Sequence, residues 1–298
     1  MPREVELKLA LGNDGPALLC GHRLLQPLPS TCLTLANTYY DTLDNALEKA
    51  RIALRIRHTP TRILQTLKTA GQTGAGLSSR DEWEWQIDGE LDIAGLVDLP
   101  PIQALDSVVL EALEPRFSTH FERRIWNIKR GEAHIEVALD QGDIRSGSRR
   151  VAINELELEL KPGGRHSAGP EALLRLAFEL AEHVPLRLAN ASKAARGGAL
   201  LKQRWPTGTG DEKNNERSNT QARFDQAIDA LDAWTDSGDN RFRTLANDAL
   251  ETIANDSSQS AEIREHAHAL AVSLATPNWL NIAFGRHGLA LQALIQAE

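Results

Sequence analysis

Between residues 3 and 161 the chain repeats one pattern, in which charged and apolar residues alternate over short segments. Alternate residues of a β-strand share a face, so each such segment would present one charged face and one apolar face. Short breaks separate most of the segments, which favours antiparallel neighbours over crossover connections. The segments expected to be strands are 3–11, 34–42, 51–59, 62–70, 80–87, 118–128, 133–146 and 149–161.

The charges on these faces are sorted by sign. One face of the last segment carries Glu155, Glu157 and Glu159. One face of the third segment carries Arg55 and Arg57. Two interpretations follow: an antiparallel sheet with one wet face, or a closed barrel with the charged faces inward. Like charges side by side on a wet face repel one another, and buried charges are costly without partners. A charged interior therefore predicts a bound polyanion together with cations.

The composition argues against some classes of binding partner and indicates a cellular compartment. The 298 residues carry a formal net charge of -8, which argues against a general nucleic-acid binder. The sequence contains no apolar run of about 18 residues, so we expect no membrane-spanning helix. Cys20 and Cys32 form no CxxC pair, which argues against a disulfide framework or a zinc site and fits a cytoplasmic location.

The last part of the chain differs from the first. A polar stretch at 204–222 is expected to be a linker, and residues 223–298 have a helical pattern that suits three or four helices. We therefore predict a barrel domain at 1–203, the linker, and a small helical domain at 223–298. Within the first domain, helices are expected at 14–26, 100–114 and 168–183.

Eight short motifs follow one another along the chain. One ExExK strand would recur by chance, but the ordered set covers residues 1 to about 203 and is specific. The motifs are Glu4 to Lys8 (EVELK), Tyr39 to Thr42 (YYDT), Ala53 to Arg57 (ALRIR), Thr66 to Lys68 (TLK), Arg80 to Glu84 (RDEWE), Phe121 to Trp126 (FERRIW), Glu155 to Lys161 (ELELELK) and Ser192 to Gly197 (SKAARG). In this order they resemble the CYTH domain, the fold of the triphosphate tunnel metalloenzymes.

The resemblance implies an α+β fold: a closed eight-stranded antiparallel β-barrel with flanking helices and a small C-terminal helical region. It also implies metal-dependent hydrolysis of a small triphosphate, and the inorganic triphosphatase branch predicts inorganic triphosphate as the substrate, cleaved to diphosphate and phosphate. The alternatives are an adenylate cyclase or a nucleoside or thiamine triphosphatase of the same fold. A non-catalytic sensor of triphosphate or polyphosphate is a further alternative.

The resemblance also assigns metal ligands. Hard oxygen donors suit Mg²⁺ or Mn²⁺, and the family pattern implies two ions. The candidate ligands are Glu4, Glu6, Asp140, Glu155, Glu157 and Glu159. Lys8, Asp140 and Glu157 are the candidate catalytic residues, and Asp140 would either hold a metal or position the attacking water.

Basic residues on the same faces are the candidate phosphate ligands, because arginine can bind phosphate through two nitrogens. Arg123 and Arg124 point to opposite faces; the family pattern places Arg123 inside, and a bulge would reverse this. Arg196, one helical turn from Lys193, would contact phosphate or cap the tunnel. The candidate set is Lys8, Arg55, Arg57, Lys68, Arg123, Lys193 and Arg196.

The inorganic triphosphatase branch often carries a helical CHAD domain that binds polyphosphate. Residues 223–298 are too short for a full copy and lack its histidine and arginine pattern. We therefore expect a truncated CHAD-like tail or an unrelated helical region.

Overall fold

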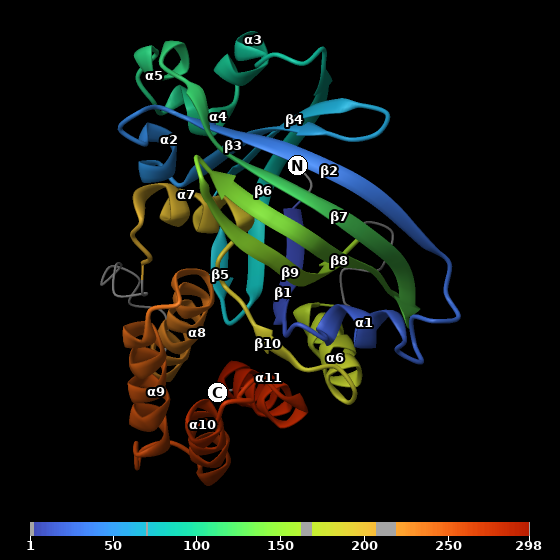
Figure 1. Ribbon diagram of the computed structural model, residues 1–298, viewed down its shortest axis with the longest axis vertical. Coiled ribbons are helices and arrows are strands. Elements are labelled where there is room, and N and C mark those ends of the chain that lie inside the picture. Colours follow the sequence, from blue (N-terminus) through green and yellow to red (C-terminus); the bar gives the residue numbers. More distant parts are fainter. Residues whose placement is uncertain (1–2, 70, 162–168, 207–218, 298) are drawn as a thin grey trace.

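The structure is a computed structural model in which residues 3–69, 71–161, 169–206 and 219–297 are described. Its long strands form a ring in the order β1-β9-β8-β7-β2-β3-β4-β6, and β6 pairs back onto β1 (Figure 1). Every pairing in the ring is antiparallel, so the predicted closed eight-stranded barrel is confirmed. The strands are β1 (Arg3–Leu11), β2 (Ser30–Asp41), β3 (Ile52–His58), β4 (Ile63–Thr69), β6 (Leu77–Ile87), β7 (Glu114–Arg130), β8 (Ala133–Ser146) and β9 (Arg149–Leu160).

Two short strands extend the sheet beyond the ring. β5 (Gln72–Gly74) pairs with β6, and β10 (Leu186–Leu188) pairs with the second half of β1. The sequence did not predict either one, because three residues are too few to show a period of two.

Helices cover the outer, apolar faces of the barrel strands. Leu54 and Leu67 pack with Leu96 in one buried cluster, and Leu7 and Leu158 belong to another that includes α6. Because the apolar faces point outward into these clusters, the charged faces line the interior. The wet-sheet interpretation is therefore wrong. The covering helices are α1 (Gly15–Cys20), α2 (Ala46–Lys49), α3 (Ile93–Val97), α4 (Pro100–Gln103), α5 (Val108–Glu111) and α6 (Pro170–Ala181). The expected helix at 100–114 is thus divided into α4 and α5.

One end of the barrel interior is apolar. Leu200 of α7 (Lys193–Lys202) packs against Leu35, Phe121, Ile144 and Ile153. Strand alternation puts these side chains on the same faces as the interior charges. The α7 helix therefore closes an apolar section of the barrel, and the ionic section lies beyond it.

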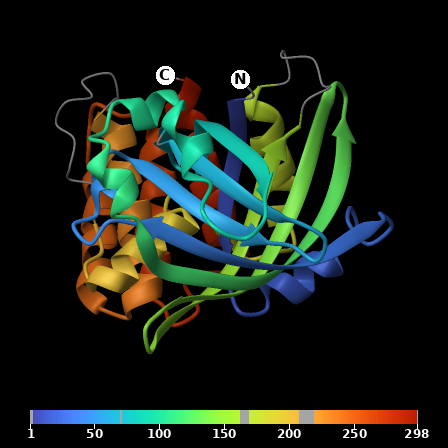
Figure 2. The same ribbon diagram turned by 90° about the horizontal axis from the view of Figure 1, so that it is seen from above.

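The C-terminal helices gather at one end of the barrel, beside β10 and α6 (Figures 1 and 2). They are α8 (Asn219–Ser237), α9 (Asn240–Ala254), α10 (Ala261–Leu274) and α11 (Ile282–Ala297). At Gly285 of α11 an added Cβ would lie 2.5 Å from the Leu186 carbonyl oxygen, so this helix approaches β10 closely.

The described part of the chain contains no helix that is long and apolar enough to span a bilayer. Residues 70, 168 and 207–218, which belong to a predicted strand, a predicted helix and the predicted linker, lie outside the described residues. The division into two domains stays a prediction.

Candidate functional site

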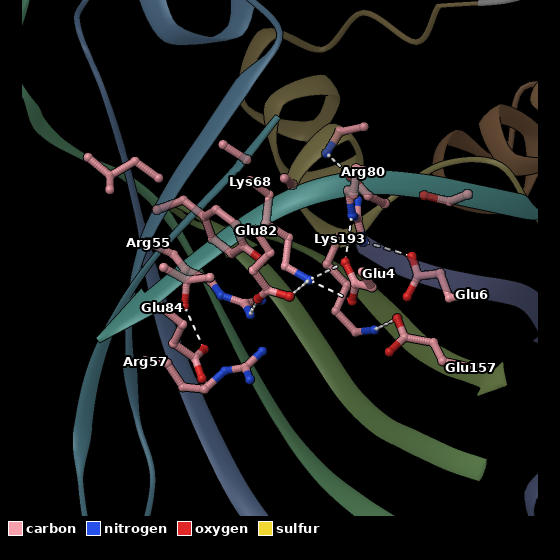
Figure 3. A pocket seen from close by; sticks show the side chains of 18 of the residues that line it. Glu4, Glu6, Arg55, Arg57, Lys68, Arg80, Glu82, Glu84, Glu157 and Lys193 are labelled. Atoms are coloured by element: carbon pink, nitrogen blue, oxygen red, sulfur yellow. Dashed lines mark hydrogen bonds and ion pairs between the residues drawn. The ribbon is translucent and has the colours of Figure 1, made fainter. Parts of the chain in front are cut away.

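A cavity of about 620 Å³ lies inside the barrel, within the usual range for small-molecule sites. Side chains from β1, β3, β4, β6, β9 and α7 converge on it (Figure 3). The structure brings together most of the residues that the sequence singled out. Those that line the cavity are Glu4, Glu6, Lys8, Arg55, Arg57, Lys68, Arg123, Glu157, Glu159 and Lys193.

One wall of the cavity is a surface of carboxylates. Glu159 lies opposite Glu6 on β1 and opposite Glu136 on β8. Burial raises the pKa of Glu159; Lys161, at 2.8 Å, offsets part of the rise, and Glu4 and Glu136 add to it. Neighbouring carboxylates of this kind destabilise a sheet unless a cation is shared between them. Carboxylate oxygens are the donors that a hard divalent cation prefers, and in this structure the Lys161 ammonium group pairs with both Glu136 and Glu159.

Glu4 is held in the ionised form by two cations. The Lys68 Nζ lies 2.9 Å from it and the Arg80 Nε lies 3.0 Å from it. Burial alone would raise the pKa of this carboxyl, yet Lys68 and Arg80 lower it to about 2. Arg80 also reaches Glu6 at 2.7 Å, so one guanidinium bridges the two carboxylates of β1.

The β3 strand supplies a second, cationic group. The Arg57 Nε donates to the Asn37 Oδ1 at 3.0 Å, and within the described residues no carboxylate lies at ion-pair distance from Arg57. Burial and the neighbouring guanidinium groups of Arg55 and Arg123 lower the pKa of Arg57 to about 10. A half-buried cation beside other cations favours a bound anion.

Arg123 and Lys193 belong to one ion-pair network. Arg123 donates to both oxygens of Asp140 at 2.7 Å and to Glu157 at 2.6 Å. The Lys193 Nζ lies 2.7 Å from Asp140, 2.5 Å from Glu155 and 3.0 Å from Glu157. These three carboxylates are spaced closely enough to hold a metal ion. The ammonium group of Lys193 nevertheless lies among them, and it accounts for their clustering without a metal.

Three predicted site residues do not line the cavity. Asp140 is fully buried beneath Arg123, and Glu155 is buried beside Lys193. Arg196 pairs with Glu155 and with Asp236 of α8. Their contact with metal or substrate stays a prediction, and their placement favours support of Arg123 and Lys193.

Other cavity residues were missing from the set chosen from the sequence. Glu136 and Lys161 line the cavity, and Lys161 pairs with both Glu136 and Glu159. The same alternation could have found them, because Glu136 shares a face with Asp140. Asn37, which accepts a hydrogen bond from Arg57 but does not itself line the cavity, had no such signal: it is uncharged, and only the pairing of β2 with β3 brings it to Arg57.

The profile of the CYTH domain family matches residues 2–197. A protein of Haemophilus influenzae described as an inorganic triphosphatase is 36% identical over 217 residues, which are 70% of this chain and 57% of that protein. The chain thus spans little more than half the length of this relative.

A solved structure from Hippeastrum, described as a putative adenylyl cyclase with a dominant triphosphatase activity, has a TM-score of 0.50 and 20% identity to this chain. The match covers 66% of this chain and 95% of that one, and at this identity it supports the fold alone. The family match, in contrast, extends over the whole barrel and the start of α7. The protein therefore belongs to the CYTH domain family.

Proposed function

We propose that the protein is a Mg²⁺- or Mn²⁺-dependent triphosphatase that cleaves inorganic triphosphate to diphosphate and phosphate. The proposal is supported by the relative described as an inorganic triphosphatase. The observation that carries it is the division of the cavity into a carboxylate wall and a cationic group around Arg57, whose pKa is lowered by burial and by its cationic neighbours Arg55 and Arg123. Such a site suits a polyanion that arrives with its counter-ions.

The metal ligands in this proposal are the carboxylates of β1 and β9 that line the cavity: Glu4, Glu6, Glu157 and Glu159. Bound divalent ions would neutralise phosphate oxygens and make water more nucleophilic. Glu4 and Glu6 stay paired with Arg80, which holds their side chains in place.

The phosphate ligands are Lys8, Arg55, Arg57, Lys68, Arg123 and Lys193. In phosphoryl transfer the protein mainly aligns the phosphate and stabilises charge, and arginine and lysine groups aimed into a partly buried cavity supply both. We assign Asp140 to orient Arg123 through its two hydrogen bonds, since it is buried behind that side chain.

Phosphate release from triphosphate, ATP and thiamine triphosphate, each with Mg²⁺, Mn²⁺ or EDTA, tests the proposal. We expect metal-dependent release that is fastest with inorganic triphosphate. Formation of cyclic AMP as the main product from ATP would identify a cyclase instead. Tight triphosphate binding without turnover would identify a sensor.

A matched pair of variants ties the activity to the cavity. Glu6→Gln removes an interior carboxylate, whereas Glu122→Gln makes the same change on the exposed outer face of β7. We expect the first to abolish metal-dependent turnover and the second to retain it. Equal activity in both variants would exclude Glu6 from the metal site.

A further inference from the structure

The helix α8 contacts the barrel through a row of acidic residues. Asp225, Asp229, Asp232 and Asp236 lie on one side of the helix, because three or four residues make about one turn. Asp225 accepts a hydrogen bond at 2.6 Å from the backbone N–H of Ala75, in the turn between β5 and β6. The other three contact the segment from 187 to 196. This segment runs from β10 into the first turn of α7 and includes Lys193.

Asp232 fixes the start of that segment. It accepts from the Arg187 Nη1 at 2.5 Å and from the backbone N–H groups of Asn190 at 2.9 Å and Ala191 at 2.8 Å. The side chains of Arg187 and Asp232 are both buried. A buried pair whose two carboxylate oxygens are both hydrogen-bonded rigidifies the backbone around it, so the chain enters α7 in one fixed direction.

Asp236 connects α8 to the cavity. It accepts from the Arg196 Nε at 2.9 Å and Nη2 at 2.6 Å. The Arg196 Nη1 donates to Glu155, and Glu155 in turn accepts from the Lys193 Nζ at 2.5 Å. The Asp236 side chain is only 3% exposed. A continuous series of charge-assisted bonds therefore runs from the C-terminal helical region to a cavity-lining ammonium group.

We propose that Asp236 is a positioning residue for the triphosphate site. It holds Arg196, and through Arg196 and Glu155 it fixes the direction in which Lys193 points toward bound phosphate. The C-terminal helical region is thereby part of the support of the site. This inference rests on the proposed function for the role that it gives Lys193.

Arg196 and Lys193 compete for Glu155, and this competition would transmit a change at Asp236 to Lys193. Arg196 lies between Asp236 and Glu155, and each takes part of its hydrogen bonding. Without the charge on Asp236, Arg196 is balanced by Glu155 alone. Glu155 then binds Lys193 less strongly, and Lys193 shifts toward Asp140 and its other partners.

Three variants of the full chain test the proposal: Asp236→Asn, Asp236→Glu, and Asp248→Asn as the control. Asp248 is exposed on α9, where the same change alters no contact with the barrel. With triphosphate and Mn²⁺ we expect Asp236→Asn to lower kcat/KM by about 10-fold or more, the range typical of lost outer contacts to a site. Asp236→Glu should recover most of this loss. Activity of Asp236→Asn equal to that of the control would overturn the inference.

A double-variant cycle separates positioning from general loss of folding. If Asp236 acts through Arg196, adding Asp236→Asn to Arg196→Gln should lower kcat/KM little further, because coupled residues are not additive. If Asp236 had a purely structural role, the decreases in kcat/KM caused by the two substitutions would multiply in the double variant. That result would contradict the proposed series of contacts.

A crystal structure of the Asp236→Asn variant makes the test independent of activity. We expect Lys193 to have moved away from Glu155. An unmoved Lys193 would refute the positioning role even if the wild-type protein hydrolyses triphosphate. A wild-type protein without triphosphate turnover would instead refute the proposed function, while the displacement of Lys193 could still be observed.

Discussion

Glu6 and Glu159 lie directly opposite each other on β1 and β9, with both side chains directed into the barrel. Two carboxylates in this relationship repel one another, and burial raises the pKa of Glu159. The arrangement is therefore least favourable when no metal ion is present. The first prediction follows from this pair.

Glu159→Gln is expected to remove the stabilisation by metal without weakening the metal-free fold. In EDTA its melting temperature should equal or exceed that of wild type, since an unfavourable charge is lost. With Mn²⁺ at about 100 times its Kd, the wild type should gain on the order of 2.7 kcal/mol, and the variant should gain less. Thermal unfolding with and without Mn²⁺ measures this. Equal gains in both proteins would exclude Glu159 as a ligand.

Arg57→Gln is expected to stabilise the ligand-free protein and weaken triphosphate binding. The pKa of Arg57 is lowered to about 10, so the unfolded state holds this proton more firmly than the folded state does. Each pKa unit corresponds to about 1.4 kcal/mol; because the side chain is only half-buried, we expect a gain of about 1–2 kcal/mol at pH 7. Losing a charge-assisted hydrogen bond of about 1.5–3 kcal/mol should weaken binding roughly 10-fold or more.

Urea unfolding and calorimetric titration with triphosphate measure the two effects of Arg57→Gln. Arg124→Gln is the control, because Arg124 lies on the exposed outer face next to Trp126. A variant at Arg57 that is less stable than wild type and binds triphosphate normally would contradict the anion site.

Glu4 should make the stability of the metal-free protein depend on acid pH. Its pKa is lowered to about 2 in the folded state, so its contribution is fully present above the ordinary value of 4.5 and is lost as pH falls toward 2. Glu4→Gln should therefore cost on the order of 2–3 kcal/mol at pH 7, and the two proteins should converge in acid. Denaturant unfolding between pH 7 and pH 2.5 in EDTA tests this. A difference that stays constant with pH would show that Lys68 and Arg80 do not hold Glu4 ionised.

Two adjacent glycines of α7 should respond oppositely to alanine. At Gly197 an added Cβ would lie 2.0 Å from the ring of Phe117, which stacks on Tyr39, whereas at Gly198 the nearest atom is a Glu48 oxygen at 3.5 Å. Gly197→Ala should destabilise by about 1–3 kcal/mol through overpacking, and it should lower activity by moving α7. Gly198→Ala should gain up to about 1 kcal/mol of helix propensity. The melting temperature and the turnover rate of the two variants test this. If both variants behaved equally, α7 would have to lie farther from β7 than it does in the structure.

Much of the barrel could be predicted from the sequence because strand alternation is local. The bounds of β1 and β8 were predicted to the residue, and those of β9 to within one residue. The charged faces of these strands also identified most of the cavity-lining residues. Alternation could not predict β5 and β10, which are too short. The helical pattern from residue 223 predicted most of α8 but missed its first turn, which begins at Asn219 inside the predicted linker.

The sequence by itself determined which side chains share a face, since neighbours two apart in a strand must do so. Only the tertiary structure decided what those faces meet. It closed β6 onto β1, made one section of the interior apolar around Phe121, and directed Arg196 toward Asp236 of α8 instead of the cavity. These outcomes depend on contacts between residues far apart in the chain, whose pairing no local pattern encodes.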